Sequence, residues 1–323
     1  MKTIHDFPRI PLGLTPTPLH RLDNLSRALG KNIWIKRDDM TGVGLGGNKV
    51  RKLEFLLADA RRQGADVVFT TGGAQSNHAM LTAACCNKLG MKAVLLLKAR
   101  GVTERKGNLI LDHLLGCDAQ FIDTDSYDDI YAEMHRQGAR LEARGHRPYY
   151  IPVGGSTALG AFGYIAAMEE AYGQAEAAGV RFDHTVCVCG SGGTTAGVAL
   201  GTLFHSPGTR VTAVAVDSDP FEEITRRLMK EALALLERQD AIPEDLLTIR
   251  YHVGAGYGIA GREDTEAVKT MARLEGIFLD PVYTGKAFAC FLEEVRQGAF
   301  PGENILFLHS GGAGGLFAVE LPE

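Results

Sequence analysis

Features that define several other classes of protein are missing from this 323-residue chain. No apolar stretch approaches the length needed to cross a membrane. The opening sequence, MKTIHDFPRIPLG, is broken by proline and charge where a secretory signal would carry an apolar core. We therefore expect a cytoplasmic protein that does not enter a membrane.

Long runs of basic residues and closely spaced cysteines are also missing. The formal net charge is -5, and no Lys/Arg run could neutralise a nucleic-acid backbone, so nucleic acid is not an expected partner. The six cysteines show neither zinc-ligand spacing nor the density of a disulfide scaffold. We expect reduced, buried thiols and no metal site.

Hydrophobic residues are plentiful, at 45% of the chain, and allow a large core and two domains. Short, continuously apolar runs predict strands at 33–36, 67–70, 93–98, 149–153, 185–189, 211–216 and 305–309. Amphipathic patterns predict helices at 49–63, 77–89, 126–144, 158–178 and 222–238. This alternation predicts an α/β protein whose parallel sheets have helices on both faces.

The boundary between the two domains must be inferred from turns, because no linker or repeat marks it. Gly154-Gly155-Ser156 and the stretch Gly44–Gly47 are plausible crossing points. We therefore predict a small domain, residues 48–158, inserted into a large domain made of residues 1–47 and 159–323.

The first motif that could carry chemistry is Gly44-Leu-Gly-Gly-Asn-Lys49, a glycine loop that delivers a lysine to the first turn of a helix. The positive end of the helix dipole disfavours a charged lysine and would lower the pKa of Lys49. A neutral amine is the nucleophile that Schiff-base chemistry needs. An ordinary solvated lysine after a glycine turn remains the alternative for this motif alone.

The second motif is Cys187-Val-Cys-Gly-Ser-Gly-Gly-Thr-Thr-Ala-Gly197, a strand that runs into glycines and hydroxyls and then into an apolar helix. Glycines let the backbone curl around a phosphate, and the helix N-terminus offers free N–H groups. We predict an anion site here. Asp217 follows at the dinucleotide spacing, so a nicotinamide-dependent dehydrogenase is an open alternative, although the glycines do not fit G-x-G-x-x-G.

Three more segments join strand ends to helix starts, where catalytic groups of open α/β sheets are found: Thr70–His78, Asp280–Lys286 and His309–Ala313. The first could cradle a carboxylate through backbone N–H groups and Ser76, or could simply cap a helix. A histidine such as His309 is more often structural than catalytic.

Six segments together resemble the D-cysteine desulfhydrase and 1-aminocyclopropane-1-carboxylate deaminase family over nearly the whole chain. They are Ile35–Asp39, Gly46–Glu54, Gln75–His78, Gly190–Gly197, Asp280–Lys286 and His309–Ala313. The resemblance implies two open, mostly parallel twisted sheets in the tryptophan-synthase-β-like arrangement (fold type II), pyridoxal 5'-phosphate as cofactor, a small amino-acid substrate and a homodimer.

The resemblance also implies a role for individual residues. It makes Lys49 the Schiff-base lysine and Asn77 the partner of the cofactor's phenolic oxygen. It places Ser76, Asn77 and His78 beside the substrate, and Tyr257 and Tyr283 over it. The cofactor would be held by Lys52, Ser191, Gly192, Gly193, Thr194 and Ser310.

Two positions separate the activities within this family. In this resemblance, the deaminases carry the motifs Tyr-Glu-Gly-Lys and His-Leu-Gly-Gly, whereas desulfhydrases carry hydroxyl residues in place of the Glu and the Leu. This chain has Thr284 and Ser310 at these two positions. A carboxylate near the pyridine nitrogen would keep it protonated for opening a cyclopropane ring, and a hydroxyl suffices when a good leaving group departs from Cβ. The sequence therefore favours β-elimination on D-cysteine.

Several alternatives stay open at this stage. L-Cysteate sulfo-lyases and lyases of other β-substituted alanines resemble the same pattern and are the first alternatives. A 1-aminocyclopropane-1-carboxylate deaminase is the next. A non-catalytic amino-acid or phosphate-binding protein belongs to a different class. Met80 and Leu81 stand where desulfhydrase-like sequences usually carry Arg and Gln, which predicts an altered substrate side of that helix.

Overall fold

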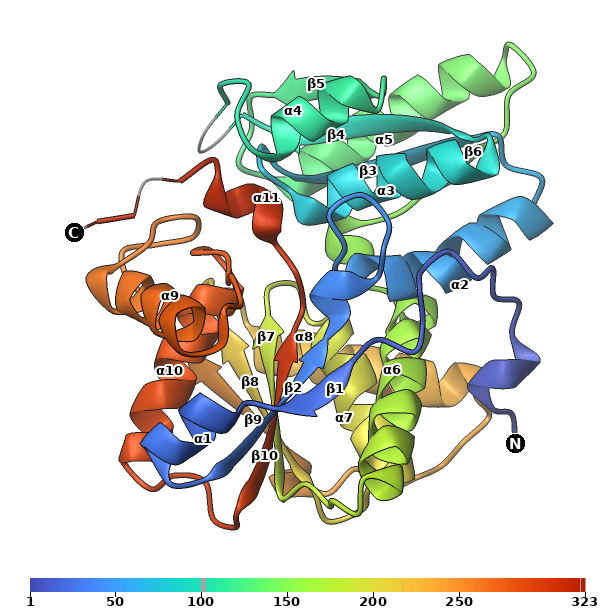
Figure 1. Ribbon diagram of the computed structural model, residues 1–323. Helices are drawn as coiled ribbons and strands as arrows, with labels where there is room; N and C mark the ends of the chain where they lie inside the picture. The colour runs from blue at the N-terminus through green and yellow to red at the C-terminus, as the bar shows by residue number, and fades with distance from the viewer. Residues whose placement is uncertain (100–102, 320, 323) are drawn as a thin grey trace.

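The computed structural model describes residues 1–99, 103–319 and 321–322 and contains two sheets flanked by helices (Figure 1). The larger sheet has the order β1-β2-β10-β7-β8-β9, and only the β1–β2 pair is antiparallel. Its strands are β1 Leu19–Arg21, β2 Asn32–Arg37, β7 His184–Cys189, β8 Arg210–Ala215, β9 Leu247–Tyr251 and β10 Asn304–His309. The predicted α/β class with mostly parallel sheets is confirmed.

The smaller sheet is entirely parallel, with the order β5-β4-β3-β6. Its strands are β3 Val67–Gly73, β4 Lys92–Lys98, β5 Asp118–Ile122 and β6 Pro148–Tyr150. These strands all come from residues 67–150, and those of the larger sheet come from outside that range. The predicted boundaries at 48 and 158 depend on where the flanking helices belong, and they stay a prediction.

Helices cover both faces of the larger sheet. The five predicted helices occur as α2 Lys49–Arg62, α3 Asn77–Leu89, α5 Tyr127–Glu142, α6 Ala158–Ala177 and α8 Phe221–Leu235. The others are α1 Asp23–Leu29, α4 Asn108–Leu114, α7 Gly193–His205, α9 Arg262–Glu275, α10 Thr284–Arg296 and α11 Ala313–Leu316. Short 3-10 turns occupy Ile4–Asp6, Asp38–Met40, Val153–Gly155 and Glu244–Leu246.

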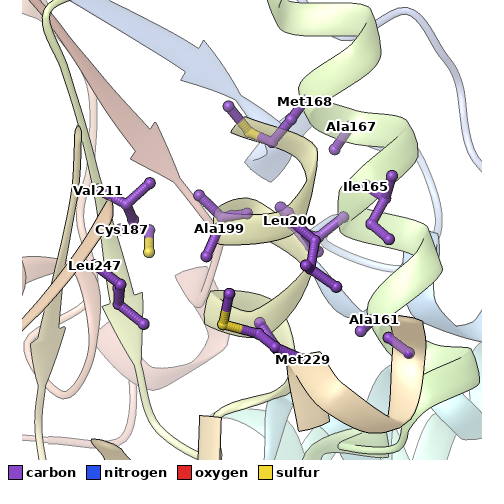
Figure 2. Packing of buried hydrophobic residues seen from close by; sticks show 14 of the residues in the cluster. Ala161, Ile165, Ala167, Met168, Cys187, Ala199, Leu200, Val211, Met229 and Leu247 are labelled. Carbon is purple, nitrogen blue, oxygen red and sulfur yellow. The ribbon is translucent and has the colours of Figure 1, made fainter. Parts of the chain in front are cut away.

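The strand β7 shows why its sequence is continuously apolar. Cys187 and Cys189 point into the cluster formed with α6, α7 and α8, whereas Val186 and Val188 point into the cluster formed with α1, α9 and α10. Figure 2 shows the first cluster, in which side chains of α6, α7 and α8 meet those of β7, β8 and β9. All six cysteines are free, and only Cys117 is partly exposed.

The strands that the sequence did not reveal lie at or near sheet edges, where one side is not fully covered. β5, with the sequence Asp-Ala-Gln-Phe-Ile, is partly exposed throughout, and β9 buries only Leu247 fully. Their apolar runs are therefore interrupted by polar residues. None of the helices in the described part of the chain is long and apolar enough to span a membrane.

Candidate active site

The site is built where the carboxyl ends of strands from both sheets face each other. The glycine loop before α2 is tied to the end of β10 by a bridge between Gly47 and Gly311 and by Asn48, whose N–H donates to the carbonyl of Ser310 at 2.9 Å. This pairing places Lys49, the first residue of α2, beside the loop that follows β10.

The immediate surroundings of Lys49 favour a neutral amine. Its Nζ donates to Oδ1 of Asn48 at 2.9 Å, and burial lowers the pKa of Lys49 to about 8, against the opposing effect of the nearby Asp280 carboxylate. The direction agrees with the sequence analysis, but burial is the main cause. Near neutral pH this lysine is therefore deprotonated far more often than a solvated lysine.

The predicted anion loop lies at the N-terminus of α7. Gly192 has a φ of +81° and precedes the first helical residue, Gly193, without a side-chain cap. In the described part of the chain, Ser156 Oγ accepts the N–H of Gly193 at 3.2 Å, and no acceptor is seen for the N–H of Thr194. The Thr194 hydroxyl accepts from Asn48 Nδ2 at 3.0 Å and keeps its proton for another partner.

Lys52 lies beside this loop, one turn after Lys49 on α2. It is 0% exposed, and its Nζ donates to the Gly154 carbonyl at 2.7 Å and to Ser156 Oγ at 3.2 Å. Burial, assisted by the charge of Lys49, lowers the pKa of Lys52 well below its ordinary value. Within the described residues it has no carboxylate partner, so a bound anion would supply the missing counter-charge.

Ser156 was not singled out by the sequence as a site residue, although it follows the two glycines noted as a crossing point. Its Oγ also lies 2.8 Å from Ser191 Oγ, so it joins Lys52, Ser191 and Gly193. A Cβ added at Gly193 would stand 2.7 Å from both Lys52 Nζ and Ser156 Oγ. The cradle thus requires glycine, and its helix end, hydroxyls and buried ammonium suit a phosphate group.

The turn between β3 and α3 brings the next three predicted residues together. Ser76 caps α3, with its Oγ accepting from Ala79 N–H at 3.2 Å. Asn77 accepts at Oδ1 from Asn108 Nδ2 at 2.7 Å, which leaves its own Nδ2 without a partner among the described residues. This helix end offers donors to a carboxylate or an oxyanion.

His78 is buried, and its hydrogen bond with Thr70 fixes which ring nitrogen carries the hydrogen. Its Nε2 lies 2.9 Å from Thr70 Oγ1, whose proton goes to the Ile151 carbonyl, so Nε2 carries the hydrogen. Burial, with help from Lys49 and Lys52, lowers the pKa of His78 well below its ordinary value. A neutral ring with a bare Nδ1 offers no hydrogen to a substrate carboxylate, so its predicted role there stays a prediction.

The two predicted tyrosines meet across the site. Tyr257 and Tyr283 share a short hydrogen bond between their hydroxyls, with their rings edge to face. Tyr257 lies against Gly73 at the end of β3, and Tyr283 lies against Gly190 at the end of β7. Burial and the neighbouring Tyr257 raise the pKa of Tyr283 well above its ordinary value, so its hydroxyl keeps its proton.

Thr284 and Ser310 differ in the freedom of their hydroxyls. Thr284 Oγ1 donates to Asp280 Oδ1 at 2.7 Å and accepts from Asp280 N–H at 2.9 Å. Asp280 also accepts the N–H groups of Val282, Tyr283 and Thr284, which fixes the start of α10. Among the described residues, Ser310 Oγ has no hydrogen-bond partner and remains available to a ligand.

Other singled-out residues lie away from the ligand side. Met80 and Leu81 are buried on α3 and pack under the glycine loop, near Gly44 and Gly47 respectively. They support the loop that carries Lys49 and do not extend the Ser76–His78 surface. His309 is also structural, since its Nε2 donates to the Phe278 carbonyl and its Nδ1 accepts from Gly311 N–H.

Comparison with solved structures shows that the same fold occurs in two distant enzymes. A threonine deaminase from T.th. has a TM-score of 0.64 at 22% identity, with 92% of each chain covered. A fungal L-serine ammonia-lyase from Rhizomucor miehei has a TM-score of 0.65 at 18% identity, with 94% of each chain covered. The fold is therefore that of the fold type II pyridoxal-phosphate enzymes.

The family profile described as "Pyridoxal-phosphate dependent enzyme" matches residues 10–311. Proteins of Pyrococcus abyssi and Pyrococcus horikoshii, both named "Putative 1-aminocyclopropane-1-carboxylate deaminase", are 40% and 41% identical, over 96% of this chain and 93% and 94% of theirs. The crystal structure of an "ACC deaminase homologue" has a TM-score of 0.91 at 39% identity, covering 97% of this chain and 94% of its own.

The chain belongs to the pyridoxal-phosphate-dependent enzymes and, within them, to the family of 1-aminocyclopropane-1-carboxylate deaminase and D-cysteine desulfhydrase. Its cofactor is pyridoxal phosphate, which the anion cradle and Lys49 fit. The dehydrogenase and the non-catalytic binding protein, which the sequence alone left open, are therefore set aside.

Proposed function

We propose that this enzyme catalyses β-elimination on D-cysteine, converting it with water to pyruvate, sulfide and ammonia. The free hydroxyl of Ser310 beside the Lys49 loop, together with the hydroxyl residue Thr284, carries this proposal. In the family resemblance, deaminases carry Glu at the position of Thr284 and Leu at the position of Ser310. A hydroxyl can accept or donate weakly without forcing a charge on the cofactor's ring nitrogen, which suits departure of a good leaving group.

The groups in the site suit the proton movements of this reaction. Bound pyridoxal phosphate supplies the electron withdrawal that stabilises negative charge at Cα. Lys49, with a pKa of about 8, is the base for the Cα proton. Ser76 and the N-terminus of α3 hold the substrate carboxylate, and the protonated Tyr283, oriented by Tyr257, hydrogen-bonds the leaving sulfur.

The second candidate is a 1-aminocyclopropane-1-carboxylate deaminase, favoured by the names of the Pyrococcus relatives. Ring opening of that substrate needs a strong electron sink, which a carboxylate paired with the ring nitrogen would provide. Asp280 is the carboxylate near Lys49, but its oxygens are occupied by the start of α10 and by Thr284. An L-cysteate sulfo-lyase, or a lyase of another β-substituted alanine, would use the same site with a different leaving group.

The deciding experiment is a substrate panel on the purified holoenzyme. D-Cysteine, L-cysteine, L-cysteate and other β-substituted alanines would be assayed for pyruvate, and 1-aminocyclopropane-1-carboxylate for 2-oxobutanoate. We expect the largest kcat/KM with D-cysteine and equal yields of sulfide and pyruvate. A larger kcat/KM for 2-oxobutanoate formation would replace this proposal with the deaminase.

A further inference from the structure

Asn108, the first residue of α4, touches the site without facing the ligand. Its side chain is 0% exposed and lies behind the turn that carries Asn77. Asn108 Nδ2 donates to the backbone carbonyl of Gln75 at 2.9 Å and to Asn77 Oδ1 at 2.7 Å. Both hydrogens of this amide are therefore used on the turn between β3 and α3.

The orientation of these amides follows from backbone groups whose roles cannot be exchanged. Gln75 Nε2 donates to the Lys106 carbonyl at 3.1 Å, and Gln75 Oε1 accepts from the backbone N–H of Asn108 at 2.9 Å. The Gln75 carbonyl can only accept, so Asn108 must turn its NH₂ toward it. The same NH₂ then requires an oxygen at Asn77, which leaves the Asn77 NH₂ facing the site.

We propose that Asn108 is a positioning residue that fixes Asn77 as a hydrogen-bond donor to the cofactor's phenolic oxygen. The inference rests on the proposed cofactor contact of Asn77. A donor at this position stabilises the form of the bound cofactor in which that oxygen carries full negative charge. An inverted Asn77 amide would present its oxygen there and repel it.

Helix α11 covers the other side of the Asn108 side chain. Asn108 Oδ1 lies so close to α11 that a Cβ on Gly314 would stand 1.9 Å away, and this oxygen has no hydrogen-bond partner among the described residues. In Figure 1, α11 lies beside α4, between the two sheets. Asn108 is thus enclosed between the turn before α3 and α11, with little room to change its rotamer.

The test exchanges the Asn108 amide for a carboxylate, which can only accept. In Asn108→Asp, the Asn77 NH₂ should turn toward the new carboxylate and away from the cofactor. The visible absorption of lysine-bound pyridoxal phosphate changes with pH, and the midpoint of that change should lie about one pH unit or more higher in the variant than in the wild type. A shift of this size is expected for the loss of a hydrogen bond to a charged oxygen. Cofactor affinity, measured by fluorescence titration, should fall by about tenfold or more.

A matched control lies one turn further along the same helix. Asp112 is buried, and within the described residues its carboxylate has no hydrogen-bond partner. Asp112→Asn makes the reverse exchange without touching Asn77, and it should leave the pH midpoint of the absorption unchanged. If Asn108→Asp does not fold, Asn108→Ala replaces it, with a smaller shift in the same direction because the Asn77 amide is then free to turn either way.

A double-mutant cycle separates this inference from the function on which it rests. Asn77→Ala should raise the midpoint, and Asn108→Asp should add nothing in that background. If Asn77→Ala raises the midpoint but neither Asn108 variant does, the positioning role is wrong while the cofactor contact stands. If Asn77→Ala leaves the midpoint unchanged, the cofactor contact and the positioning role both fall. Failure of D-cysteine turnover in the wild type, with these shifts intact, would overturn only the proposed substrate.

Discussion

At the scale of single residues, the site contains two lysines whose surroundings disfavour the protonated, charged form. Lys49 and Lys52 share one side of α2, and burial lowers the pKa of each. They differ in their hydrogen bonds among the described residues, since Lys52 donates to Gly154 and Ser156, whereas Lys49 donates to its neighbour Asn48 alone. Lys49 is therefore the amine free to react, and Lys52 is committed to the anion cradle.

We expect Lys49 of the cofactor-free protein to react with a small acylating reagent with a pH midpoint near 8. The fraction of neutral amine at that pH exceeds that of a solvated lysine on the order of a hundredfold. The measurement is acylation rate against pH, read by mass spectrometry of the peptide containing Lys49. The same peptide in the urea-unfolded chain is the control and should show a midpoint near 10. A midpoint near 10 in the folded protein would contradict the assignment of Lys49 as the base.

Attachment of the cofactor gives a second, independent check on Lys49. Borohydride reduction of the holoenzyme should fix pyridoxal phosphate on the peptide at Lys49, and Lys49→Ala should leave no reducible attachment. Lys52 lies one turn away on the same helix and is the natural control. Mapping of the adduct to Lys52 would reverse the two roles.

Ser310 and Thr284 should respond differently to loss of their hydroxyls. Thr284→Val removes the donor and the acceptor that hold Asp280, so the free energy of unfolding should fall by about 1–3 kcal/mol. Ser310→Ala removes a hydroxyl that has no hydrogen-bond partner among the described residues, so stability should change by no more than about 0.5 kcal/mol while turnover of D-cysteine changes. Urea unfolding and pyruvate release measure the two effects. A stability loss in Ser310→Ala as large as in Thr284→Val would show that Ser310 is structural.

At the scale of elements, the proposed cofactor site is formed by α7 and α2. The N-terminus of α7 provides the anion cradle, and its first residue approaches Lys52 and Ser156 too closely for any side chain. Thr195 follows two residues later, and its buried hydroxyl lies next to the thiols of Cys187 and Cys189 on β7. The glycine backbone is therefore more important than this threonine.

Gly193→Val should weaken retention of pyridoxal phosphate far more than Thr195→Ala. The valine would clash with Lys52 and Ser156, whereas Thr195→Ala removes one hydroxyl that lies beside Cys187 and Cys189. Equilibrium dialysis of the two variants measures the difference. Equal retention in both would mean that the phosphate binds elsewhere.

Helix α2 is anchored by a buried ion cluster two residues after Lys49. Arg51 donates to both oxygens of Asp38 and to Glu170, and Tyr164 also donates to Asp38. Burial by itself would raise the pKa of Asp38, but its pairing with Arg51 outweighs that effect and holds the pKa below its ordinary value. The cluster joins α2 to the end of β2 and to α6.

Arg51→Met should destabilise the protein by about 3–5 kcal/mol, because it leaves the Asp38 carboxylate buried and charged without its guanidinium partner. As the pKa of Asp38 is lowered by folding in the wild type, its contribution is present above the ordinary carboxyl pKa and is lost as pH falls below it. Arg62→Met, at the exposed end of the same helix, is the control and should cost no more than about 0.5 kcal/mol. Urea unfolding near pH 7 and at low pH measures both. A loss in Arg51→Met no larger than in Arg62→Met would show that the cluster does not stabilise the fold.

At the scale of the whole molecule, the site takes groups from both sheets. Asn77 follows β3 of the smaller sheet, whereas Ser191 follows β7 of the larger sheet. Tyr257, from the segment after β9 of the larger sheet, lies against Gly73 at the end of β3. A ligand that contacts groups from both sheets stabilises their relative arrangement. The homodimer implied by the family resemblance stays a prediction, which light scattering of the purified protein would test.

Addition of pyridoxal phosphate to the cofactor-free chain should raise Tm and slow amide hydrogen exchange at both strand ends together. At a free ligand concentration of 100 times Kd, the stabilisation expected from binding to the folded state alone is about 2.7 kcal/mol. Hydrogen exchange read by mass spectrometry locates the protection, with NADH as the ligand control. Protection confined to the 190–195 loop would show that the cofactor does not join the two sheets.

The sequence by itself predicted what neighbouring residues determine together. The glycine loop that ends at Lys49, the anion loop before α7 and the cap at Ser76 are local, and their roles follow from helix ends and backbone geometry. The interior strands were found because burial on both faces demands continuous apolar runs. The edge strands β1, β5 and β9 were missed because partial exposure permits polar residues.

Only the tertiary structure decided which distant groups meet. Lys52 and Ser156 are 104 positions apart, and the interaction of Asn77 with Asn108 spans 31 positions. Nothing in the local sequence of either partner specifies such a pair, because the contact depends on how α2, α3 and α4 pack against one another and against the sheets. The same packing determines that Met80 and Leu81 support the glycine loop and that Thr284 is engaged by Asp280 while Ser310 stays free. Residue types thus predicted the chemistry, and long-range packing decided which atoms are available to perform it.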